Sequence, residues 1–170
     1  MQLTLVLGGI ASGKSAQAEA LVRAANLPMI YLATAQARDA EMKAKIERHQ
    51  TTRGPGWKTI EEPLNIADAL RNAPADHAIL FDCATMWLTN HLLADHDLAA
   101  EREGLLSALA ACPSQVVVVS NEVGLSGVPD NALARRFANE QGHLNQALAE
   151  QAACVIVVTA GLAQTLKDAP

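Results

Sequence analysis

Eight residues near the start of the chain have the types and the spacing of a loop that binds phosphate. They read Gly-Gly-Ile-Ala-Ser-Gly-Lys-Ser, which is the pattern G-x-x-x-x-G-K-S. Glycine lets the backbone curl closely around a polyphosphate, so that successive N–H groups point inward at the anion. We expect Lys14 to reach the β- and γ-phosphates and the Ser15 hydroxyl to hold Mg²⁺. The predicted nucleotide contacts of this phosphate loop are Gly8, Gly9, Ile10, Ala11, Ser12, Gly13, Lys14 and Ser15.

Polar side chains follow three other apolar runs. Asp82 comes after four apolar residues, which is typical of the carboxylate that helps to hold Mg²⁺; its alternative role is to cap the helix that follows. Glu122 could share that metal, act as a base for a hydroxyl nucleophile, or be an ordinary surface carboxylate. Thr34 ends another run, and we expect its hydroxyl or backbone to border the nucleotide.

His49 is the histidine with the most distinctive surroundings. Met42 and Ile46 precede it at helical spacing, so it belongs to the apolar side of an expected helix. One interpretation is a half-buried structural histidine. The other is a covalent nucleophile, because Arg48 and Arg53 stand nearby and would neutralise the phosphate that the imidazole attacks. The residues alone leave both interpretations open.

The remaining histidines and the cysteines predict no further chemistry. None has metal-ligand spacing to another, so we expect no zinc site. An odd number of scattered cysteines favours a reducing compartment without a disulfide framework, and no apolar run is long enough to cross a bilayer, so we expect a cytoplasmic protein with no membrane span. These residues are His77, His91, His96, His143, Cys83, Cys112 and Cys154.

A parallel sheet would bring these side chains together at one edge. Short Val/Ile/Leu-rich runs alternate with helical patterns, which predicts an α/β fold with a mainly parallel sheet. Ligands bind at the carboxyl ends of such strands. The expected strands are 3–7, 29–34, 78–82, 116–120 and 155–159, with a last edge strand within 160–167. One expected helix follows the phosphate loop directly. The others cover 39–49, 64–70, 85–93, 98–111 and 131–149, and the last of these could be interrupted at Gly142. Segment 51–57 is expected to be an irregular loop.

Composition favours a single globular domain over residues 1–170. Half of the residues are apolar and 18% are charged. The net charge is −5, and there are only two Trp, one Tyr and two Phe. Nucleic-acid binding needs basic surface and stacking platforms, so this composition argues against a nucleic-acid partner.

Together the motifs resemble one family, the bifunctional adenosylcobinamide kinase / adenosylcobinamide-phosphate guanylyltransferases of cobalamin biosynthesis. The order of the motifs along almost the whole chain is far more specific than the phosphate loop alone. Besides that loop, the resemblance is carried by Tyr31-Leu32-Ala33-Thr34-Ala35, Ile46-x-x-His49, Asp82-Cys83-x-Thr85-x-Trp87, Ser120-Asn121-Glu122-Val123-Gly124 and Leu144-Asn145-Gln146.

The resemblance implies a RecA-like P-loop NTPase fold with helices flanking the sheet, a homotrimer, and two reactions. ATP or GTP phosphorylates the aminopropanol hydroxyl of adenosylcobinamide. GTP then donates GMP to adenosylcobinamide phosphate through a covalent intermediate on the matching histidine, His49, which gives adenosylcobinamide-GDP. Beyond the phosphate loop, the implied nucleotide contacts are Ala33, Thr34, Ala35, Gln50, Thr51, Thr52, Arg53, Glu61 or Glu62, and Asp82.

Overall fold

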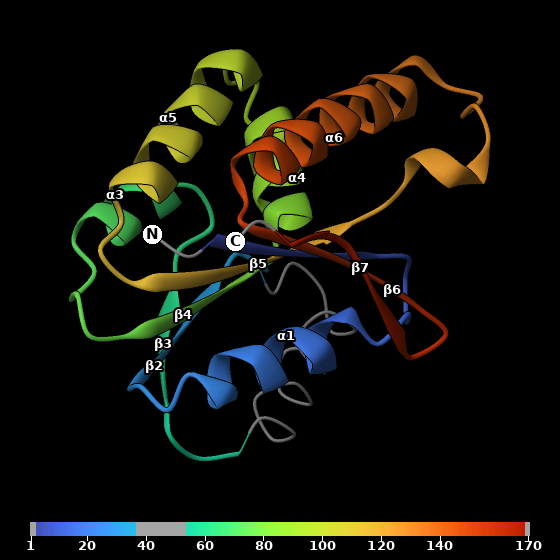
Figure 1. Ribbon diagram of the computed structural model, residues 1–170. Coiled ribbons are helices and arrows are strands. Elements are labelled where there is room, and N and C mark those ends of the chain that lie inside the picture. Colours follow the sequence, from blue (N-terminus) through green and yellow to red (C-terminus); the bar gives the residue numbers. More distant parts are fainter. Residues whose placement is uncertain (1–2, 37–53, 169–170) are drawn as a thin grey trace.

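A seven-stranded sheet forms the centre of the computed structural model, which describes residues 3–36 and 54–168 (Figure 1). The strand order is β3-β2-β4-β5-β1-β6-β7. β7 runs antiparallel to β6, and every other pairing is parallel. The strands are β1 (Leu3–Gly8), β2 (Met29–Ala33), β3 (Trp57–Glu61), β4 (Ala78–Asp82), β5 (Gln115–Asn121), β6 (Cys154–Thr159) and β7 (Leu162–Asp168).

Helices cover both faces of the sheet, as expected for an α/β fold. Figure 1 shows α1 on one face and α3 to α6 on the other. The helices are α1 (Lys14–Ala24), α3 (Ile66–Arg71), α4 (Ala84–Leu93), α5 (Leu98–Ala111) and α6 (Ala132–Gln151), with a 3₁₀ turn, η1 (Gly124–Ser126), before α6. None of these described helices is long and apolar enough to cross a membrane.

The apolar core forms two layers, one on each face of the sheet. Successive side chains of a strand point to opposite faces. Leu5 of β1 therefore joins the layer under α3 to α6, while its neighbour Val6 packs with Ala18 and Val22 of α1. Burial on both faces explains why the central strands are almost continuously apolar.

The structure confirms the strands predicted from apolar runs, including the edge strand after β6. One strand was missed: β3 lies at the sheet edge, and Lys58, Thr59 and Glu61 are exposed, so it has no apolar run. Helix α6 continues through Gly142 without an interruption. The helix predicted at 39–49 lies outside the described residues.

β1, which leads into the phosphate loop, lies between β5 and β6. Gly8 at its carboxyl end is level with Asn121 and Val158. β4 is separated from β1 by β5. The segments that follow β5 and β6 therefore flank the phosphate loop directly, and Asp82 of β4 lies one strand further away.

Candidate nucleotide site

The phosphate loop leaves the first turn of α1 open to an anion. Gly13 is the N-cap of α1, in a left-handed conformation with φ of 96°, and no side chain caps the helix. The first turn also contains no acidic residue. Because uncapped N–H groups and the helix dipole both favour negative charge, this end of α1 suits a phosphate group.

Close packing holds the phosphate loop in shape. A Cβ atom on Gly8 would lie 2.7 Å from the backbone oxygen of Val158 and would collide with Ser12 Oγ. The turn between β6 and β7 supports the other side of the loop, because Gly161 N donates to Ser12 O over 2.8 Å. The conformation of the loop therefore depends on the last two strands of the sheet as well as on its own glycines.

The charges of Lys14 and Asp82 both act on Cys83, at the start of α4. Lys14 Nζ donates to Gly9 O over 3.0 Å, and Tyr31 Oη donates to Asp82 Oδ2 over 3.1 Å. Burial, and next the charge of Asp82, raise the pKa of Cys83 to about 12, whereas the charge of Lys14 opposes this rise. Helix α4 begins after Cys83, its N-cap, so the alternative in which Asp82 caps that helix was wrong.

Glu122 lies directly beside the phosphate loop. Its backbone N donates to Gly8 O over 3.1 Å, and its Oε1 accepts a hydrogen bond of 2.7 Å from Gly124 N. A cavity of about 660 Å³ opens here, between the phosphate loop, the segment after β5 and the end of β6. It is lined by Gly8, Gly9, Ile10, Ala11, Ser12, Asn121, Glu122, Val123, Leu125, Val157, Val158, Thr159 and Ala160.

Thr34 joins the ends of β2 and β4. Its side chain is buried, and its hydroxyl accepts from Cys83 N and donates to Cys83 O, both over 2.8 Å. Asn90 of α4 donates to Thr34 O over 3.0 Å. The Thr34 hydroxyl thus has partners within the protein, and the predicted nucleotide contacts of Ala33 and Ala35, which are half-buried, stay predictions.

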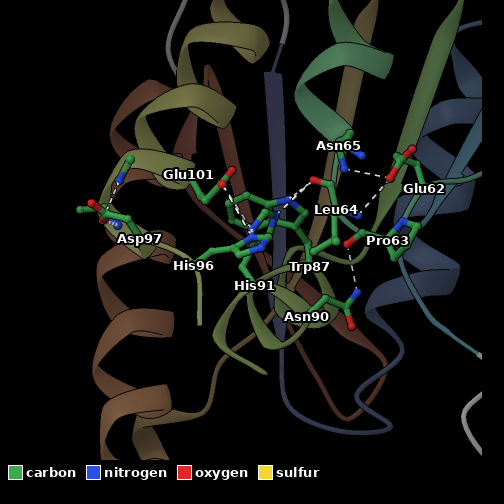
Figure 2. A network of polar contacts seen from close by, with 12 residues as sticks. Glu62, Pro63, Leu64, Asn65, Trp87, Asn90, His91, His96, Asp97 and Glu101 are labelled. Carbon is green, nitrogen blue, oxygen red and sulfur yellow. Dashed lines mark hydrogen bonds and ion pairs between the residues drawn. The ribbon is translucent and has the colours of Figure 1, made fainter. Parts of the chain in front are cut away.

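The two glutamates after β3 differ in their surroundings. Glu62 Oε1 accepts from Leu64 N over 3.1 Å and from Asn65 N over 2.8 Å, so this carboxylate stabilises the turn before α3 (Figure 2). Glu61 is exposed at the end of β3, level with Ala33 of β2. Of the two, Glu61 is the side chain better placed to meet a ligand.

A buried polar network joins the end of β5, the start of α4 and the middle of α6, and sequence reasoning did not identify it. Asn145 Oδ1 accepts from Ser120 Oγ over 2.6 Å and from Gln141 Nε2 over 2.9 Å. Asn145 Nδ2 donates to Asn121 O over 3.0 Å, and Asn121 N donates to Thr85 Oγ1 over 2.8 Å. This network fixes the backbone from which Glu122 projects. The only sequence signal for the network was that four of these five residues stand in the motifs of the family that the chain resembles.

Five predicted site residues lie outside the described part of the chain. They are His49, Gln50, Thr51, Thr52 and Arg53. The structure brings the other predicted residues to the carboxyl edge of the sheet, where the phosphate loop, β2, β3, β4 and β5 end.

Comparison with known proteins identifies full-length relatives. The chain matches the family described as cobinamide kinase / cobinamide phosphate guanyltransferase over residues 4–166. It is 47% identical over 169 residues to the bifunctional adenosylcobalamin biosynthesis protein CobP of Pseudomonas aeruginosa, with 98% of each chain covered. It is 40% identical over 185 residues to the bifunctional adenosylcobalamin biosynthesis protein CobU of Salmonella typhimurium, with 97% of this chain and 99% of that protein covered.

Solved structures share the fold at low sequence identity. The flagellar accessory protein FlaH of Methanocaldococcus jannaschii superposes with a TM-score of 0.54 at 13% identity, over 99% of this chain and 79% of that chain. The RadB recombinase gives a TM-score of 0.54 at 16% identity, over 92% of this chain and 73% of that chain. These similarities confirm the predicted P-loop NTPase fold.

Proposed function

Because the chain belongs to the cobinamide kinase / cobinamide phosphate guanyltransferase family, we propose that it catalyses both reactions in adenosylcobalamin biosynthesis. It phosphorylates adenosylcobinamide with ATP or GTP and then transfers GMP from GTP to the new phosphate. The structural observation that carries this proposal is the uncapped N-terminus of α1, with Lys14 in its first turn and Glu122 beside the loop.

In the kinase step, the phosphate loop holds the triphosphate and Lys14 contacts its β- and γ-phosphates. The oxygen of the substrate hydroxyl bonds to the γ-phosphorus, the bond to the β-phosphate oxygen breaks, and Glu122 accepts the hydroxyl proton. The cavity between the loop and Leu125 has room for the aminopropanol arm of the acceptor. Positioning of the two reactants is the main contribution of the protein to such a transfer.

The residues present fit a magnesium ion. Ser15 lies in the first turn of α1, Asp82 ends β4 and Glu122 follows the neighbouring β5, so these elements offer three oxygen donors of the kind that Mg²⁺ prefers. Bound Mg²⁺ would neutralise charge on the β- and γ-phosphates. Ser15 and Asp82 are the proposed ligands, and Glu122 is an alternative ligand if it does not serve as the base.

In the guanylyl-transfer step, His49 is the proposed nucleophile. An imidazole nitrogen bonds to the α-phosphorus of GTP, pyrophosphate leaves, and GMP is held as a phosphoramidate. The phosphate of adenosylcobinamide phosphate then attacks the same phosphorus and releases the histidine. This proposal rests on the motif Ile46-x-x-His49 and on the family, since both residues lie outside the described part of the chain.

We also propose the homotrimer that the resemblance implies. Large apolar side chains are exposed on the segment between β5 and α6 and at the start of α6: Leu125 is 91% exposed, Val128 84% and Leu133 55%. Large apolar side chains exposed on one short stretch of the chain support a protein interface there. Sedimentation equilibrium should give three times the chain mass, and a purely monomeric protein would contradict this proposal.

Labelling with GTP that carries ³²P at the α-phosphorus tests the transferase proposal. With Mg²⁺, we expect an acid-labile, base-stable label on the wild-type protein and none on His49→Ala. His143→Ala is the matched control, because His143 is exposed on α6, and it should keep the label. GTP labelled at the γ-phosphorus should leave none. Wild-type protein that is folded and shows kinase activity yet takes no label would overturn the proposal for His49.

A further inference from the structure

Two histidines and a glutamate from separate elements meet at the turn between α4 and α5 (Figure 2). His91 lies in the last turn of α4, His96 in the connecting turn, and Glu101 in the first turn of α5. His91 Nδ1 is 2.9 Å from His96 Nδ1. Glu101 Oε1 is 3.7 Å from the first of these nitrogens and 3.8 Å from the second.

We propose that His91, His96 and Glu101 bind a divalent transition-metal ion, Zn²⁺, at a site separate from the nucleotide site. Tetrahedral Zn²⁺ with bonds of about 2.0–2.1 Å holds neighbouring ligand atoms about 3.3–3.4 Å apart. The three measured separations, 2.9, 3.7 and 3.8 Å, lie on either side of this value. Small rotations of three side chains therefore suffice to coordinate the ion.

His91 is already oriented as a metal ligand. Leu64 O can only accept, so the contact of 3.2 Å from His91 Nε2 places the ring proton on Nε2 and leaves a lone pair on Nδ1. A ligating histidine ordinarily donates its other N–H to such a carbonyl. Trp87 packs against the ring, with 4.6 Å between centroids, and also donates to Leu64 O.

The turn that carries His96 is held by its own backbone. His96 N donates to His91 O over 3.1 Å, and Asp97 Oδ1 caps α5 by accepting from Ala99 N and Ala100 N. Glu101 N donates to Asp97 O over 3.0 Å. Short local contacts thus fix the backbone from which His96 and Glu101 project, so that ordering the site costs little backbone conformational entropy.

Exposure gives the ion a route into the site. The His96 and Glu101 side chains are 41% and 42% exposed, whereas His91 is almost wholly buried. Three protein ligands leave a fourth position for water. Imidazole ligands also disfavour Mg²⁺ and Ca²⁺, which prefer oxygen, so the site selects a transition metal.

Without the ion, a hydrogen bond from His96 Nδ1–H to His91 Nδ1 accounts for the short separation of the rings. The same bond does not account for Glu101, whose carboxylate approaches both nitrogens at distances too long for a hydrogen bond. When the ion binds, the proton on His96 Nδ1 moves to the other ring nitrogen, so each imidazole presents a lone pair to the metal. The ion would then link α4 to α5.

Zinc titration of the untagged protein tests the site. We expect dialysis against Zn²⁺ to load one ion per chain in the wild type. His96→Ala should bind zinc at least about 100-fold more weakly, because losing a direct ligand should cost at least as much as losing an outer-shell partner, which costs up to about 100-fold. Glu101→Gln should weaken binding less. His143→Ala is the matched control, because His143 Nδ1 also faces a glutamate, Glu140, at 3.8 Å but has no second histidine; it should bind as the wild type does.

Two further readouts keep the result independent of folding. Circular dichroism should show that His96→Ala is folded, since this residue is exposed. Zn²⁺ should raise the Tm of the wild type and of His143→Ala but not of His96→Ala, because an ion that binds only the folded chain stabilises it. Equal zinc affinity of the wild type and His96→Ala, or no uptake by the wild type, would overturn the proposal.

Discussion

The ammonium group of Lys14 donates a hydrogen bond to the carbonyl oxygen of Gly9, 3.0 Å away, so this lysine bridges the start of α1 and the start of the phosphate loop. A bound triphosphate offers the same group a stronger, charged acceptor. We expect Lys14→Gln to lower the rate of phosphoryl transfer about 100- to 1000-fold, the usual effect of removing one donor to a transition-state anion.

Transfer of labelled γ-phosphate to adenosylcobinamide measures this effect. Lys58→Gln is the control, because Lys58 is exposed on the edge strand β3 and should keep the wild-type rate. An unchanged rate in Lys14→Gln would show that this lysine does not contact the reacting phosphates.

Gly8→Ala should destabilise the protein even without nucleotide. The new methyl group would lie 2.7 Å from Val158 O, and backbone in a central strand cannot move aside as a side chain can. We expect the free energy of unfolding to fall by about 1–3 kcal/mol, as for other overpacked sites.

Gly9→Ala is the matched control for Gly8→Ala, since a Cβ on Gly9 meets nothing within 4 Å. Urea denaturation of the nucleotide-free proteins compares the two variants. Equal stability of both would mean that Gly8 is not closely packed in solution.

Asn145→Ala should disrupt the polar network beneath Glu122. The change removes the acceptor of Ser120 Oγ and Gln141 Nε2 and the donor to Asn121 O. Leaving such buried groups unsatisfied costs about 1–3 kcal/mol.

Asn139→Ala is the control for the network, because Asn139 lies exposed on the same helix. Thermal unfolding should separate the two variants, and kinase turnover should fall only in Asn145→Ala, since Asn121 precedes Glu122. A similar Tm for both would contradict the role of the network.

The Cys83 thiol should resist alkylation in the native protein. Its pKa is raised to about 12 by burial and then by the charge of Asp82, so almost no thiolate exists at neutral pH. Folding raises this pKa, which means that the folded chain holds the proton more tightly than the unfolded chain. The stability contributed by the neutral thiol is complete below the ordinary pKa of 9.0 and is lost as the pH rises toward about 12.

Mass spectrometry after treatment with iodoacetamide checks the thiol, with urea-unfolded protein as the positive control. Stability measured as the pH rises above 9.0 should fall less steeply in Cys83→Ala than in the wild type. Rapid alkylation of native Cys83 would contradict the raised pKa of its thiol.

Apolar runs predicted the buried strands because a strand covered on both faces must be apolar throughout. β3 could not be found in this way, since an edge strand leaves side chains such as Lys58 in solvent and depends on its pairing with β2. Helix α6 passes through Gly142 without a break because packing of its long apolar face outweighs the cost of one glycine.

The phosphate loop was predictable because its chemistry lies in one continuous segment. The other polar clusters join residues that are remote in the sequence: Ser120 meets Asn145, and Thr34 meets Cys83. His91 and His96 come together with Glu101 only because α4 turns directly back into α5, which ligand spacing along the chain did not reveal. Such contacts depend on how the helices and strands are arranged in space, so the spacing of residues along the chain did not predict them.

The central position of β1 has a consequence for biosynthesis. β1 is synthesised well before both of its neighbours, since Leu3 pairs with Val116 of β5 and Thr4 with Cys154 of β6. Pairings between such distant segments form slowly. A nascent chain that still lacks β6 and the turn after it has neither the strand nor the Gly161 amide that support the loop. The growing polypeptide therefore cannot complete the support of its phosphate loop until β6 and the turn that contains Gly161 have been synthesised.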